Sequence, residues 1–172
     1  ITRIGVIAFD KCFAFSLEET NQDIPYNLPV SLTTLGECAF QNCTGITRVC
    51  LPEGVTVVPR YAFNGCTKLN GVVLSKQTVT IEDWAFAGTA LTGISLPATV
   101  TSLGDNVFHN CSELIGVQSY PTTAPTITAT TFSHDKGTIK EQCRLFVLPT
   151  ASSAYDSWKN YFKAVVADLT EQ

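Results

Sequence analysis

Residues 35–43, Leu35-Gly36-Glu37-Cys38-Ala39-Phe40-Gln41-Asn42-Cys43, decide the fold, because close copies of this stretch recur along the chain. The copies occupy residues 4–12, 58–66, 81–89 and 103–111. Each copy has a phenylalanine at the position of Phe40, and successive phenylalanines are 31, 23, 23 and 22 residues apart. Such a period, with one longer unit, is typical of proteins built by stacking small repeated units.

A short run of the form L-x-x-V-x-L follows the repeated stretch. In the second unit it reads Ile46-Thr47-Arg48-Val49-Cys50-Leu51-Pro52, and related runs occupy residues 69–74, 91–97 and 114–118. Alternate side chains of a strand point to the same face, so Val49 and Leu51 are expected to face inward and Cys50 outward. A unit this small cannot bury its apolar side alone, so the units must stack, with strands pairing in parallel about 4.8 Å apart. The repeat therefore predicts a solenoid.

Two segments depart from the repeat without ending it. The first unit is eight residues longer than the others, and its surplus, residues 16–26 (SLEETNQDIPY), is expected to form an acidic surface loop. Residues 121–131 are rich in Thr and Pro, yet Ile127 and Phe132 each lie 24 residues after their counterparts in the preceding unit. This segment is therefore interpreted as a degenerate sixth unit, and residues 145–148 are expected to restore a strand.

Apolar residues recur at helical spacing near the end of the chain. The intervals of three and four residues predict an amphipathic helix over residues 152–169, with Ser152 or Ser153 as its N-cap. Its apolar face consists of Tyr155, Trp158, Phe162, Val165 and Leu169. An open solenoid end exposes apolar side chains and an unpaired strand edge, so this helix is expected to cap the stack.

The core G-x-x-A-F-x-x-C, followed by L-x-x-V-x-L-P at a period near 23, resembles the BspA-like leucine-rich repeats of bacterial cell-surface and secreted proteins. The tail, L-F-V-L-P followed by A-Y-D-S-W-K-N-Y-F, is similar to the closing segment of that family. The resemblance covers residues 1–169, with departures such as Thr89 in place of cysteine and Val107 in place of alanine.

The resemblance implies an α/β repeat solenoid, a right-handed leucine-rich-repeat coil with a parallel β-sheet on one face and short helical turns on the other. We expect a single domain over residues 1–172. It comprises about five repeats over 1–120, a degenerate last repeat over 121–149 and the cap over 150–172. The resemblance also implies a non-catalytic surface or secreted module used in adhesion or protein contact.

The composition excludes several classes of function. With 15 acidic against 11 basic residues and a net charge of −4, the chain is not expected to bind nucleic acid. No apolar stretch approaches the roughly 18 residues that cross a bilayer, so no direct membrane insertion is expected in this segment. Because the sequence contains no Met, we expect it to be part of a longer exported protein whose signal or anchor lies elsewhere.

The seven cysteines favour packing over chemistry. Cys12, Cys43, Cys66 and Cys111 share one repeat position, as expected of buried free thiols, whereas an odd total without a C-x-x-C pair argues against a disulfide framework. Cys50 is expected to face outward and to be the most reactive thiol.

Catalytic and metal chemistry find little support in the sequence. His109 is expected to be a surface residue, His134 lies in an irregular stretch, and neither accompanies a nucleophile motif. The acidic residues of 16–26 lack the spacing of a calcium loop. We therefore predict no catalytic residues, no cofactor and no metal.

Two surfaces are candidates for a partner. The first is the outward face of the strands, which is small, flat and nearly uncharged and includes Arg48, Cys50, Val73, Ser95 and Gln118. The second is the pair Tyr61 and Trp84, one repeat apart, which are expected to stack on the turn face, where the simpler interpretation is that they shield the coil.

Three functions remain open. The leading hypothesis is a non-enzymatic extracellular module that binds a protein or glycan partner at the cell surface or after secretion. A structural spacer that presents other domains is the alternative. A remote third is a cysteine-dependent enzyme centred on Cys50 or His134.

Overall fold

The computed structural model describes residues 1–11, 26–135, 137–138 and 141–170. The expected acidic loop over 16–26 falls almost entirely outside these residues, as does Cys12. The elements are β1 (Arg3–Ile4), β2 (Tyr26–Asn27), β3 (Thr34–Leu35), β4 (Arg48–Cys50), β5 (Val57–Val58), β6 (Gly71–Val73), β7 (Thr80–Ile81), β8 (Gly93–Leu96), β9 (Ser102–Leu103), β10 (Gly116–Ser119), β11 (Ser133–His134), β12 (Gly137–Thr138), β13 (Arg144–Val147), the 3₁₀ helix η2 (Pro149–Tyr161) and β14 (Ala164–Ala167).

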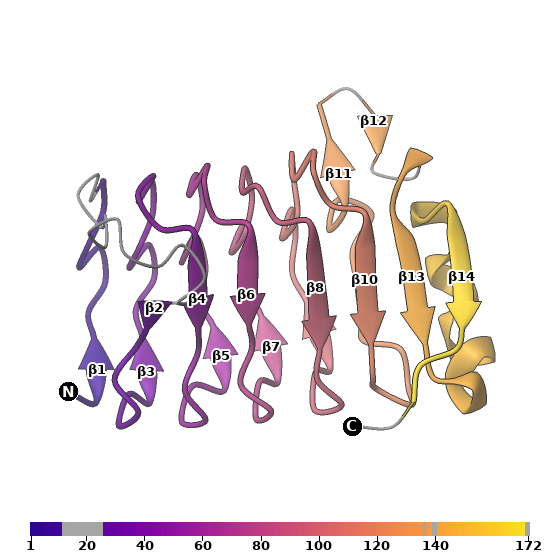
Figure 1. Cartoon of the computed structure of the whole chain (residues 1–172), viewed down its shortest axis with the longest axis horizontal. Helices are drawn as coiled ribbons and strands as arrows, with labels where there is room; N and C mark the ends of the chain where they lie inside the picture. Colours follow the sequence, from indigo (N-terminus) through magenta and orange to yellow (C-terminus); the bar gives the residue numbers. More distant parts are fainter. Residues whose placement is uncertain (12–25, 136, 139–140, 171–172) are drawn as a thin grey trace, which may run out of the picture.

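Successive repeats form coils that stack side by side along the long axis of the molecule (Figure 1). On one face, strands β2, β4 and β6 form one parallel sheet, and β8, β10, β13 and β14 form another. Strands β4, β8 and β10 place the inner residue of the L-x-x-V-x-L run in the core, namely Val49, Ile94 and Val117. The parallel solenoid that the repeat predicts is confirmed.

A second, narrower set of strands precedes the repeated turns. β1 pairs with β3, and β5, β7 and β9 form a three-stranded parallel sheet whose strands are only two residues long. These strands lie behind the larger sheets in Figure 1. Each coil is therefore held to its neighbours on more than one side.

The expected short helical turns are wrong for the described repeats, which turn without forming a helix. Inside the second unit only alternate N–H groups bond within the turn, such as Ala39 to Gly36 O at 3.3 Å. The intervening groups donate to the next coil, as Phe40 does to Ala62 O at 2.9 Å and Asn42 to Asn64 O at 2.7 Å. In a helix, the backbone N–H groups beyond the first turn donate to carbonyl groups of the same helix. Because alternate N–H groups here donate to the neighbouring coil, the turn does not become helical.

Two positions in each turn also have a left-handed backbone that interrupts a helix. One lies two residues before the phenylalanine and has φ between 54° and 59° at Ile7, Cys38, Tyr61, Trp84 and Asn106. The other lies two residues after it, at Lys11, Asn42, Gly65, Gly88 and Asn110. Gly and Asn tolerate this conformation, whereas other L-residues pay about 1–2 kcal/mol for it.

The repeated phenylalanines form one stacked column through the core. Ring centroids of Phe9, Phe40, Phe63, Phe86 and Phe108 follow at 5.1, 5.4, 5.6 and 6.1 Å, with the ring planes within 11° of parallel. Phe132 continues the column at 5.3 Å from Phe108. Phe132, which directly follows residues 121–131 of the segment interpreted as a degenerate unit, thus lies in the same column as the earlier phenylalanines.

The chain end differs from the expected helix over 152–169. The helix η2 starts earlier, with Pro149 in its first turn and Leu148 as an N-cap that makes no side-chain bond, and it ends at Tyr161. Residues 164–167 instead form β14, which pairs in parallel with β13. The open edge of β13 offers backbone partners that a longer helix would leave unused, and Val165 and Val166 favour a strand.

The aromatic residues of η2 cover the last coil. Trp158 and Phe162 are buried against Phe132, with ring centroids 5.7 and 4.9 Å away. Tyr155 donates its hydroxyl to Pro121 O at 2.9 Å, and the Trp158 indole N–H donates to Pro125 O at 3.3 Å. Both buried polar groups are therefore satisfied as the apolar surface is covered.

Strands β11 and β12 pair in antiparallel fashion and project from the upper edge of the stack in Figure 1. None of the helices in the described part of the chain has the length and apolar character to cross a membrane.

Replacing Phe63 by Ala should destabilise the protein by about 3–5 kcal/mol, because a fully buried ring leaves a cavity between two stacked neighbours. Chemical denaturation measured by circular dichroism gives the free energy of unfolding. Val30→Ala is the control, since Val30 is 93% exposed and should lose less than about 0.5 kcal/mol. Equal small losses for the two variants would contradict the buried column.

Deleting residues 149–172 should make the protein aggregate or melt at a clearly lower temperature. The deletion uncovers Phe132 and the parallel edge of β13, and a bare edge templates further pairing. Light scattering and thermal melts measure both effects. A truncated chain that stays monomeric with an unchanged melting temperature would show that η2 and β14 are an appendage.

Candidate functional site

The large parallel face is divided between β6 and β8. No ladder in the described residues joins these two strands, although they are neighbours in the stack. The sequence shortens here, since Leu91 follows Phe86 by five residues while Leu69 follows Phe63 by six. We attribute the lack of pairing between β6 and β8 to this missing residue, because it changes the position at which the chain passes from the turn into β8.

The division opens the face toward the core. Val72 occupies the inward position of β6 and is only half-buried, whereas its counterparts Val49 and Val117 are 1% and 0% exposed. The sheet therefore has a local opening and not a uniform flat surface.

A row of three glycines forms the floor of this opening. Strand register aligns Gly71 with Arg48 on β4, and Gly116 with both Gly93 and Arg144. These positions all face outward, so the absence of a Cβ at three successive strands leaves a track over the backbone. The track has an arginine in the same column at each end.

Two side chains lie over the track from opposite sides. A Cβ added at Gly71 would lie 3.0 Å from Arg48 Nε, and one added at Gly116 would lie 3.6 Å from Phe146 Cε2. At Gly93 it would meet only Gly116 O, at 3.4 Å. The middle of the track is thus the most open part.

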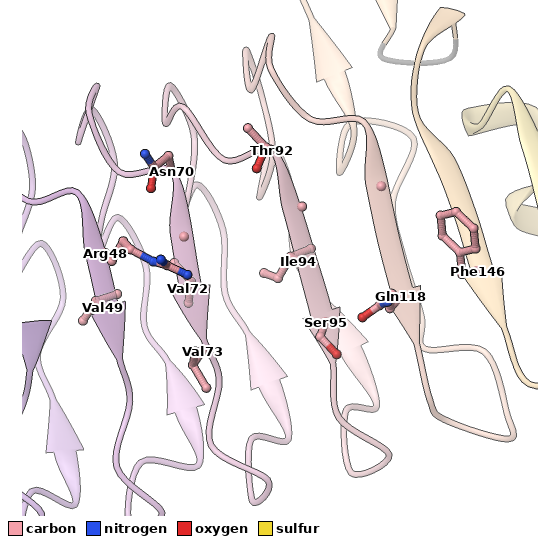
Figure 2. A pocket seen from close by; sticks show the side chains of 13 residues that line it. Arg48, Val49, Asn70, Val72, Val73, Thr92, Ile94, Ser95, Gln118 and Phe146 are labelled. Carbon is pink, nitrogen blue, oxygen red and sulfur yellow. The ribbon is translucent and has the colours of Figure 1, made fainter. Parts of the chain in front are cut away.

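The result is a hollow of about 430 Å³ on the sheet face (Figure 2). Arg48 and Phe146 border it along the stack. The other lining side chains are the polar Asn70, Thr92, Ser95 and Gln118 and the apolar Val49, Val72, Val73 and Ile94. Such a mixture offers hydrogen-bond donors and acceptors, one cation and one ring face to a ligand.

The strands of this face carry positive charge on an acidic protein. Strands β4, β6, β8, β10, β13 and β14 contain Arg48 and Arg144 and no Asp or Glu. Both arginines are exposed, and no carboxylate among the described residues forms an ion pair with either one. Their guanidinium groups are available to an anionic ligand.

The structure groups most of the predicted strand-face residues in one place. Arg48, Val73, Ser95 and Gln118 line the hollow, while Cys50 is half-buried beside Val73 and outside the lining. Sequence reasoning missed Phe146. The signal was present in Leu145-Phe146-Val147-Leu148, where strand alternation places Phe146 in the outward column of Gln118.

Tyr61 and Trp84 lie elsewhere, on the turn face, and stack as expected with ring centroids 6.1 Å apart. The Arg60 guanidinium lies 5.2 Å from the Tyr61 centroid, and His109 contacts Trp84 edge-on at 5.1 Å. Arg60 thus contacts the Tyr61 ring, and His109 contacts the Trp84 ring. The contacts favour shielding of the turn face over ligand stacking.

His109 ties the β11–β12 hairpin to the stack. Its Nδ1 lies 2.7 Å from Ser133 Oγ, and its Nε2 lies 3.2 Å from Asp135 Oδ1. The Ser133 hydroxyl donates to Asn106 Oδ1 at 3.0 Å, so its proton points away from His109. A hydrogen bond from Asn110 and the nearby His109 lower the pKa of Asp135. Serine, histidine and aspartate are in contact here, but the serine hydroxyl donates to Asn106 and not to His109. We therefore interpret these contacts as holding the hairpin against the stack.

The cysteine column is buried and reduced in the described residues. Cys43, Cys66 and Cys111 donate to the carbonyl oxygens of Phe9, Phe40 and Phe86 in the preceding coils, at 2.7, 3.0 and 3.1 Å. Burial raises the pKa of Cys66 to about 12 and that of Cys111 to about 11. The packing role predicted for these residues is confirmed.

No group of three or more metal-binding side chains occurs in the part of the chain that the structure describes. None of the hydrogen bonds within that part joins Cys50 to a histidine.

Comparison with known proteins agrees with this architecture. The family model described as BspA type leucine-rich repeat region, with six copies, matches residues 1–115. No curated protein matches the chain.

Several solved structures are similar. A leucine-rich repeat protein from Bacteroides ovatus shares 25% identity over 85% of this chain and 35% of its own, with a TM-score of 0.66. The T. pallidum leucine-rich repeat protein shares 27% identity over 84% and 62% of the two chains, with a TM-score of 0.63. A leucine-rich cell surface protein from Faecalibacterium prausnitzii shares 21% identity over 96% and 54%, with a TM-score of 0.55. The chain therefore spans between about one third and two thirds of these structures.

Cys50 should react first with a thiol reagent at pH 8. Cys43, Cys66, Cys111 and Cys143 are buried, and the raised thiol pKa of the last three keeps them protonated. Mass spectrometry over time identifies the order, and modification of the buried cysteines should require denaturant. Disulfides among them, or labelling as fast as that of Cys50, would contradict this packing.

Proposed function

Because the chain belongs to the BspA type leucine-rich repeat family, we propose that it is a non-enzymatic interaction module that binds a protein or glycan partner. The observation that carries the proposal is the glycine-floored hollow, because it combines concavity, unpaired charge and hydrogen-bonding side chains. A spacer that only separates other domains requires no such feature. The partner would contact Arg48, Ser95, Gln118 and Phe146.

We also assign the module to the outside of the cell, at the surface or secreted, where it would serve adhesion. The name of the Faecalibacterium prausnitzii relative places that protein at the cell surface. The proposed location is supported by the resemblance to BspA-like repeats and by the name of this relative.

A regular repeat also suits a binding role physically. Stacked coils hold their strands in fixed register, so outward side chains from β4 to β13 keep their relative positions without a loop having to order. Preorganised groups bind with less loss of conformational entropy.

Gly93→Trp should abolish binding at the hollow. A Cβ fits at this position, and the indole would then occupy the space above the middle of the track. Labelled wild-type protein is applied to arrays of glycans and peptides, and the variant should lose at least about tenfold of the signal, as for a blocked pocket.

Ala154→Trp is the matched control, because Ala154 is exposed on η2 and should tolerate the same side chain without loss. Melting temperatures confirm that both variants are folded. Wild-type signals that survive in Gly93→Trp would place the binding surface elsewhere, and a wild-type protein without any array signal would favour the spacer.

A further inference from the structure

We propose that the hollow binds an acidic oligosaccharide that lies across the strands and extends past the hollow onto β13. Its carboxylates would contact Arg48, which lines the hollow, and Arg144, which lies outside the lining but pairs in register with Gly116. This inference rests on the proposed function and names the ligand class for the same site. It follows from the charge, shape and chemistry of the face.

The two arginines define the ends of the ligand. Ladder register places Arg48 beside Gly71, and Gly93 and Arg144 on either side of Gly116, while Gly71 and Gly93 hold equivalent repeat positions across the division. The ligand would therefore run along the stack over bare backbone. Four strand steps separate the arginines, and the three between paired strands measure about 4.8 Å each, so the end-to-end length is at least roughly 15–20 Å. A guanidinium matches a carboxylate with two parallel hydrogen bonds, which favours anionic groups at both ends.

The lining between the arginines suits sugar rings. Asn70 and Thr92 lie along one side of the track in Figure 2, and Ser95 and Gln118 lie along the other. Their amide and hydroxyl groups can both donate and accept, as the hydroxyls around a pyranose require. Phe146 stacks on no other aromatic ring in the described residues, so one face of its ring can contact the apolar side of a sugar.

The same features disfavour a peptide. A peptide across the strands obtains few main-chain bonds, because the backbone groups of β4 and β10 pair in their ladders and only the facing edges of β6 and β8 are unpaired. The three glycines of the floor also have no side chains that could enclose the aromatic or long apolar anchors on which protein interfaces depend. Ring-shaped, hydroxyl-rich groups can instead lie flat on the track.

The test titrates galacturonic acid tetramer into the complete chain by calorimetry, with the neutral galactose tetramer of the same linkage as the comparison ligand. The acidic tetramer should bind, and the neutral one should bind at least about tenfold more weakly, since a hydrogen bond to a charged group contributes about a factor of ten or more. Raising the salt from about 50 mM to about 500 mM should weaken the acidic ligand only, because salt screens exposed charges.

Variants then locate the contacts. Arg48→Gln and Arg144→Gln should each weaken binding about tenfold, and Phe146→Ala should weaken both tetramers by a similar factor. Arg60→Gln is the matched control, because Arg60 is exposed on the turn face and should bind as the wild type does. All four positions are partly or fully exposed, so folding should survive each change.

Equal affinity for the two tetramers, or unchanged binding by the Arg48→Gln/Arg144→Gln double variant, would overturn the inference. A pentaglutamate peptide is titrated in the same way. If it binds more tightly than the acidic tetramer and loses affinity in both arginine variants, the ligand class is an acidic peptide and not a saccharide. Should the array ligands sensitive to Gly93→Trp all be neutral, the hollow remains the binding site and the acidic ligand class is wrong. An absence of any hollow-dependent ligand would overturn the proposed function itself.

Discussion

The structure depends on the fact that no coil of this chain can be stable alone. Each coil contributes one phenylalanine to the column, and its ring stacks on the rings of the neighbouring coils. The backbone follows the same rule, because alternate N–H groups of each turn donate to the neighbouring coil instead of forming a helix. Apolar burial and backbone pairing are thus both satisfied between repeats, which is why small units with little secondary structure of their own fold together.

This constraint explains which parts of the fold could be predicted from the sequence. Positions that face the neighbouring coil recur in every unit, so the columns of Phe40 and Cys43 identified the stacking and the buried thiols. The turn was misinterpreted as helical because apolar spacing alone does not show where the N–H groups bond. Asn42, Gly65 and Gly88 at one repeated position did signal a left-handed backbone, which ends helices.

The remaining errors arose where the chain leaves the repeat. The spacing of Tyr155, Trp158 and Phe162 located the aromatic face that covers the last coil, but Val165 also matched that spacing while its backbone pairs with β13. The outward face of the strands was predicted to be flat, because the repeat alone indicates uninterrupted pairing between successive strands. Only the coordinates show that Arg48 and Phe146 lie over this column and that the sheet divides beside it.

The divided sheet does not weaken the stack as much as a broken ladder suggests. At the same junction between coils, β5 still pairs with β7, and the Phe63 ring still lies 5.6 Å from Phe86. The turn contributes further bonds, such as Tyr61 N–H to Asp83 O at 3.1 Å. Because neighbouring coils are joined on several sides, one side can open while the others hold the register. In a solenoid of this kind a site therefore needs no inserted loop, since three outward glycines and one missing residue are enough to form a hollow on a rigid face.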